Sequence, residues 1–192
     1  MITERHINLL PYTKLTEKQI KQLEEWCEMK IETVLFDSYI HPWDINTSVM
    51  NEKIITKKNL LFLIETITGE KFGYFLESEI KEKYDYTPEI TTEKTFHFNL
   101  ESTYERLSGP MKFEAKDFEK SGYCLFKQNE CCLLTIGDIW LYKEKDKKDS
   151  LCTEDNTHFN YHNISHALCG RNPYSDNITF FTPERILIFQ MK

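Results

Sequence analysis

The residues NLLFLIETITGEKFGYFLES, at positions 59–78, constrain the fold more than any other part of the sequence. Two runs rich in Phe, Ile and Leu flank the triplet Thr68-Gly69-Glu70. Apolar runs of this length are typical of strands, and a glycine between them supplies the positive φ that a tight hairpin turn needs. The segment therefore predicts two neighbouring antiparallel strands.

Six further segments have strand character, because they alternate apolar and polar residues or are short apolar runs. They are residues 31–37, 95–100, 111–116, 122–127, 131–142 and 184–191. Helical signals do not alternate with these strands, which favours the α+β class and a β-sandwich of two antiparallel sheets with peripheral helices. One shared core is expected to contain Phe62, Ile64, Phe96, Phe98, Ile136, Trp140 and Ile188.

A helix is predicted in KLTEKQIKQLEEWCEMK, residues 14–30. Thr16 and Gln19 have the spacing of a capping box, in which each side chain binds a free backbone N–H of the first turn. The apolar residues Ile20, Leu23, Trp26 and Cys27 share one face. Residues 1–30 are thus expected to be an N-terminal segment whose amphipathic helix packs on a main domain, residues 31–192. A second, short helix is expected at 78–84.

Composition limits the partner and the compartment. The net charge is −7, and an acidic surface repels phosphate backbones, so bulk charge does not support nucleic-acid binding. Six cysteines occur without an export signal or an apolar run long enough to cross a membrane, which indicates reduced thiols. The expected location is therefore the cytosol, the nucleus or both.

The residues LCTEDNTHFNYHNISHALCG, at 151–170, are the strongest candidate for a chemical site. Imidazole nitrogens and thiolates are zinc ligands, and three histidines here recur every four residues. Against a metal, the two cysteines lack the close spacing of typical structural zinc sites. The candidate ligands are Cys152, His158, His162, His166 and Cys169, and the prediction is that they bind no metal and that the chain has no cofactor.

Catalytic motifs are absent from the sequence. It contains neither a glycine-rich phosphate loop nor a G-x-S-x-G nucleophile turn. The neighbouring Cys131 and Cys132 lie in an apolar strand, where one thiol is expected to point into the core and behave as a small apolar group. The sequence therefore predicts a protein that is not an enzyme.

Several of these segments resemble the TLDc domain family. The hairpin at 59–78, the strand TFHFNL and the final FTPERILIFQM are similar to strands of that family. IGDIWLYKEKDKKDSLCTEDNTHFNYH resembles a later block of the family, with Ser150, Cys152, Phe159 and Asn160 at its recurring positions. The resemblance extends over about residues 31–191. It implies a TLDc-like sandwich in which Cys152 and Phe159 belong to a structural loop.

The resemblance also implies a function. TLDc proteins are associated with resistance to oxidative stress, and several bind the proton-pumping vacuolar ATPase. The first hypothesis is a non-catalytic intracellular protein-interaction module linked to the oxidative-stress response. An alternative is a sequence-specific DNA-binding regulator of stress genes, and a thiol- or metal-dependent enzyme ranks third. The DNA alternative would depend on Lys53, Lys57 and Lys58, or else on the later lysines Lys145, Lys147 and Lys148.

Overall fold

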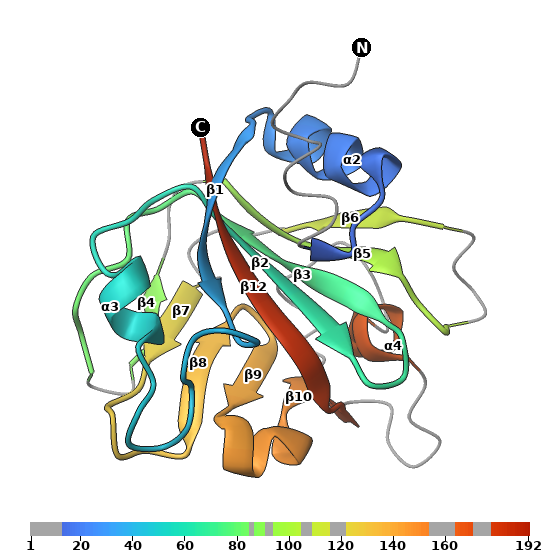
Figure 1. Cartoon of the computed structure of the whole chain (residues 1–192). Helices are drawn as coiled ribbons and strands as arrows, with labels where there is room; N and C mark the ends of the chain where they lie inside the picture. The colour runs from blue at the N-terminus through green and yellow to red at the C-terminus, as the bar shows by residue number, and fades with distance from the viewer. Residues whose placement is uncertain are drawn as a thin grey trace.

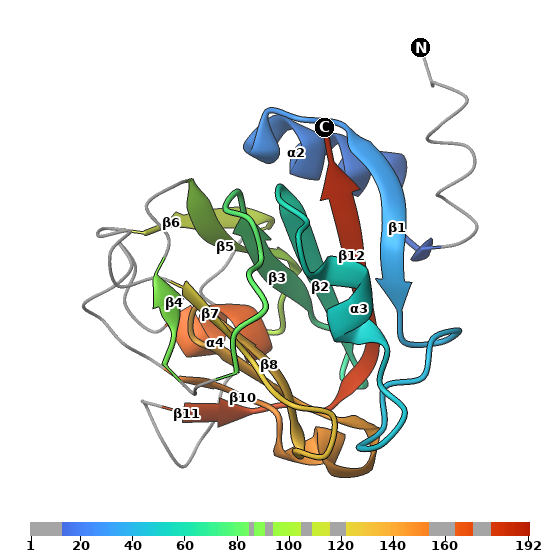
Figure 2. The ribbon, with the colours of Figure 1, turned by 90° about the vertical axis from the view of Figure 1, so that its left-hand side faces the viewer.

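The computed structural model is a sandwich of two antiparallel sheets, which confirms the predicted fold class (Figures 1 and 2). It describes residues 13–84, 87–90, 94–104, 109–115, 122–153, 164–170 and 178–192. Sheet 1 has the order β1 (Ile31–Asp37), β12 (Pro183–Met191), β2 (Leu60–Thr66), β3 (Lys71–Leu76), β5 (Thr95–Glu101) and β6 (Met111–Glu114). Sheet 2 has the order β11 (Ile178–Phe180), β10 (Leu151–Thr153), β9 (Ile139–Tyr142), β8 (Cys132–Ile136), β7 (Gly122–Leu125) and β4 (Glu89–Ile90).

The predicted hairpin is confirmed as β2 and β3. Leu61 pairs with Phe75 and Ile64 with Phe72, and Gly69 in the turn has a φ of 99°. All seven residues of β2 are buried, because one face of this strand meets sheet 2 and the other is covered by a helix. The hairpin lies at the centre of sheet 1.

The apolar interior consists of two main layers, so the prediction of one shared core is wrong. Phe62, Ile64, Ile136 and Ile188 lie between the two sheets, as predicted. Phe96 and Phe98 belong instead to a separate cluster on the outer side of sheet 1, with Leu61 and Phe75. Trp140 lies in neither cluster and is 39% exposed. Strand periodicity assigns residues to a face, but it does not determine which faces are covered.

Helix α2 (Glu17–Cys27) covers the outer cluster (Figure 2). The capping box is confirmed, since Thr16 accepts from the Gln19 N–H and Gln19 accepts from the Thr16 N–H. Ile20 and Leu23 are fully buried against sheet 1, and the Trp26 ring lies 6.3 Å from the ring of Phe98. The amphipathic helix therefore packs on the sandwich.

Three other helical segments connect strands in the described part of the chain. They are α3 (Met50–Ile54), the 3-10 helix η2 (Glu144–Asp149) and α4 (Ile164–Cys169). All six residues of α4 are buried, and this helix contacts strands of both sheets. The helix expected at 78–84 is absent, since these residues have no regular helical structure. Segment 131–142 forms two strands, β8 and β9, because Gly137 turns the chain between them.

A polar contact joins the sheets through the core. His97 on β5 is fully buried, and its Nε2 accepts a hydrogen bond of 3.2 Å from the backbone N–H of Asp138, in the β8–β9 turn. Its ring packs edge-on against Tyr74 with centroids 4.7 Å apart. Burial lowers the pKa of His97 to about 3, so the imidazole is neutral at physiological pH and can accept this hydrogen bond.

Candidate functional site

The structure places part of the cysteine–histidine segment in the core. Cys152 on β10 and Cys169 on α4 are buried and hydrogen-bond to each other, while His158 and His162 lie outside the described residues. Burial, followed by the contact with Cys152, raises the pKa of Cys169. His166 is also buried, with its ring 5.8 Å from that of Tyr104. No group of three potential metal ligands occurs among the residues that the structure describes.

Glu70 lies beside this thiol pair, but its hydrogen bonds suit a structural role. Its carboxylate accepts from the hydroxyls of Thr66, Thr68 and Thr103, the last at 2.6 Å. Burial alone would raise the pKa of Glu70, but these hydrogen bonds lower it below its usual value. A carboxylate with a low pKa is a weak proton acceptor, so Glu70 is poorly suited to act as a general base.

The adjacent cysteines differ in exposure. Cys131 is exposed, whereas Cys132 is buried in a small cluster with Cys124 and Phe126. Burial raises the pKa of Cys132 to about 12, which leaves very little thiolate at neutral pH. One of the two thiols is buried, as predicted, but Cys132 belongs to this small outer cluster and not to the core between the sheets.

A row of alternating charges crosses the outer face of sheet 1. Asp37 forms a buried, bidentate ion pair with Arg185, Arg185 lies opposite Glu65, and Glu65 lies opposite Lys71. Lys71 in turn pairs with Glu101 at 2.9 Å. Opposite charges on neighbouring strands stabilise their register.

Glu65 is the exception in this row. It is buried, and its Oε1 has no hydrogen-bond partner among the described residues. Burial raises its pKa, and this effect exceeds the opposing influence of Lys71 and Arg185. The carboxylate of Glu65 is therefore a destabilising charge at neutral pH.

Two of the lysine positions proposed for DNA binding, Lys58 and η2, lie toward opposite ends of β12. Lys58 lies beside the end of β12, because its carbonyl accepts from Gln190. The lysines of η2 lie beside the start of β12, since Ser150, directly after η2, accepts from the Phe181 N–H. β12 has nine residues, which corresponds to about 30 Å along a strand. A carboxylate lies beside the lysines in both places, Glu52 in α3 and Glu144 in η2.

The outer face of sheet 2 has no charged side chain on any described strand. Register pairs align Cys124, Thr135, Trp140, Leu151 and Phe180 in one row across five strands. Their neighbours on the strands point inward and form the core between the sheets. We call the outward-pointing set the uncharged face, and its members are Ile90, Cys124, Phe126, Cys132, Thr135, Trp140, Tyr142, Leu151, Thr153, Ile178 and Phe180.

Several large side chains of the uncharged face are open to solvent. Trp140 is 39% exposed and Phe180 is 60% exposed, and both are direct cross-strand neighbours of Leu151. In the corresponding position on sheet 1, α2 buries the outer apolar layer. Adjacent exposed aromatic residues on a surface without charge are typical of a protein-binding site. The sequence signal is the lack of charge, since Glu89 is the only charged residue in the described strands of sheet 2.

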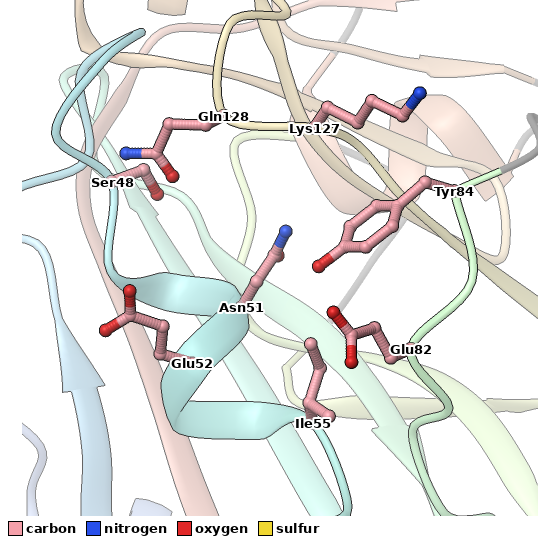
Figure 3. A pocket seen from close by; sticks show the side chains of 8 residues that line it. All are labelled: Ser48, Asn51, Glu52, Ile55, Glu82, Tyr84, Lys127 and Gln128. Carbon is pink, nitrogen blue, oxygen red and sulfur yellow. The ribbon is translucent and has the colours of Figure 1, made fainter.

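A polar pocket of about 340 Å³ lies beside α3 (Figure 3). Asn51, Glu52 and Ile55 belong to α3 or follow it, and the opposite walls include Tyr84 and Lys127. The Asn51 amide donates to the carbonyl of Phe126 at 2.9 Å and hydrogen-bonds to the Tyr84 hydroxyl. The sequence did not suggest this pocket, because its walls come from three separate connecting segments.

No protein-family model matches the chain, and no curated protein is significantly similar to it. We therefore describe the class of this protein by its fold and its surface. The chain is an antiparallel β-sandwich of the α+β class, and the uncharged face of its second sheet is partly exposed among the described residues. No helix in the described part of the chain is long and apolar enough to span a membrane.

Proposed function

We propose that this chain is a non-catalytic, intracellular protein-interaction module of the TLDc type, linked to the oxidative-stress response. The observation that carries the proposal is the uncharged face, where Trp140 and Phe180 are exposed side by side with Leu151. Large aromatic residues of this kind account for much of the binding energy in protein interfaces. The resemblance of residues 31–191 implies the vacuolar ATPase as the partner.

The double variant Trp140→Ser/Phe180→Ser tests the proposal. Burial of each large apolar side chain contributes about 1.5–3 kcal/mol, so loss of both should weaken binding of purified vacuolar ATPase at least about tenfold. Ile67→Ser is a matched control, because Ile67 is 63% exposed but lies in the β2–β3 turn of sheet 1. The control should bind like the wild type.

The link to stress has its own test. Cells that carry the double variant at wild-type abundance should lose the resistance to peroxide that the wild-type chain confers, whereas Ile67→Ser should preserve it. All three proteins should melt at similar temperatures, since the changed side chains are exposed. Equal protection and equal binding by the double variant would refute the role of the uncharged face.

A further inference from the structure

The pocket beside α3 lies where three connecting segments meet (Figure 3). Its lower wall is the side chain of Ile55, and the ring of Tyr84 forms the facing wall, so an apolar stem can lie between them. Asn51 is fixed by its bonds to Phe126 and Tyr84, which join α3 to both other segments. The pocket is therefore a preformed cavity with an apolar floor and a polar rim.

Negative charge exceeds positive charge among the residues that line the pocket. The chain neighbours of Glu82, Lys81 and Lys83, both pair with Glu89, at 2.5 and 3.3 Å. This leaves Glu82 without an ion pair among the described residues, and its carboxylate lies close to the Tyr84 hydroxyl in Figure 3. Glu82 also acts to raise the pKa of Tyr84, after the larger effect of burial.

The second carboxylate of the lining, Glu52, is exposed and has no ion pair with a described residue. Lys127 is the one cation of the lining, and Figure 3 shows its ammonium group directed away from Glu82. The lining therefore has a net charge of −1 from two carboxylates and one ammonium group. The carboxylate of Glu82 and the hydroxyl of Tyr84 lie around the same space.

We propose that this pocket binds a primary ammonium group on an alkyl stem. An ammonium group has three N–H donors and no acceptor, which suits a rim of carboxylate and hydroxyl oxygens. The methylene groups of the stem would pack on Ile55 and on the face of Tyr84, where a cation is also attracted by the aromatic ring. The ligand is either a free alkyl diamine or a lysine side chain of another protein. The pocket shares no lining residue with the uncharged face, although Asn51 binds the backbone carbonyl of Phe126.

Titration of the full-length protein with two probes tests the proposal, with the amide signals of the pocket residues followed by NMR. The probes are cadaverine and an N-acetyl-lysine N-methylamide, and the side-chain-acetylated form of the second is the neutral control. We expect saturable binding with a dissociation constant of about 1 mM, weaker at high salt because the carboxylates are exposed. Tighter binding of the lysine compound assigns a protein ligand, and tighter binding of cadaverine assigns a free amine.

The matched variants are Glu82→Gln and Glu79→Gln. Both residues are exposed carboxylates of the same segment, but Glu79 does not line the pocket. Glu82→Gln should weaken binding about fivefold or more, whereas Glu79→Gln should bind like the wild type. Absence of saturable shifts with both probes, equal affinity of the two variants, or equal binding of the acetylated control would overturn the proposal.

Discussion

At the scale of single residues, Gly137 determines how closely the sheets approach. It has a φ of 52°, and an added Cβ would lie 2.5 Å from His97 Nε2 and 2.8 Å from Tyr74 Cε2. Gly137→Ala should destabilise the protein by about 2–4 kcal/mol, from overpacking together with backbone strain. Gly69→Ala is the control, since Gly69 also has a positive φ but open space around it. It should cost about 1 kcal/mol in urea unfolding. Equal losses would show that the contact with His97 is not tight.

Glu65 provides a prediction about pH. Its pKa in the folded protein is raised above 4.5, so the folded state binds more protons than the unfolded state in the window just above that value. Stability therefore falls as pH rises through this window. Glu65→Gln removes the titrating group. Its free energy of unfolding, measured in urea, should therefore increase relative to that of the wild type as pH rises from 4 to 7. Glu25→Gln, at an exposed position of α2, controls for the loss of one charge. A difference between Glu65→Gln and wild type that does not vary with pH would contradict this assignment.

At the scale of elements, the capping box determines where α2 begins. Thr16→Ala removes the hydroxyl that accepts from the Gln19 N–H at 3.2 Å. The loss of an N-cap typically costs about 1 kcal/mol, so the midpoint of urea unfolding should fall by a corresponding amount. Thr16→Ser keeps the hydroxyl and should remain close to the wild type. If both variants were equally unstable, the methyl group of Thr16 and not its hydrogen bond would be responsible.

The two cysteines of β10 and α4 lead to a prediction about zinc binding. We expect no zinc in protein purified without a chelator or an affinity tag, because Cys152 and Cys169 contact each other in the core and no third ligand joins them among the described residues. Elemental analysis measures this directly. One equivalent of zinc that is lost in His162→Ala would mean that the segment is a metal site.

At the scale of the whole molecule, α2 and the sandwich should unfold together. Trp26 lies on α2 and contacts Phe98, whose burial links the helix to sheet 1. In the variant Trp43→Phe/Trp140→Phe, Trp26 fluorescence and far-ultraviolet circular dichroism should therefore report one midpoint. Phe98→Ala should lower both midpoints together, with a loss of about 3–5 kcal/mol. A fluorescence transition at lower denaturant would identify α2 as a separately unfolding unit.

Local patterns in the sequence predicted much of the secondary structure. The hairpin around Gly69 and the capping box of Thr16 and Gln19 depend on residues close together in the chain, so short-range chemistry determines them. The buried final strand is identified in the same way by its apolar residues. The sandwich class followed from the number of strands and from the separation of helical and strand segments.

Only the tertiary structure decided which faces are covered. Phe98 and Trp140 both lie on strands whose apolar residues recur with strand periodicity. Helix α2 covers Phe98, but no described element buries Trp140. The contact between Cys152 and Cys169, the burial of Glu65 and the pocket beside α3 depend on segments that are distant in the chain. Periodicity determines the side of a strand on which a residue lies, but coverage of that side depends on how separate elements pack.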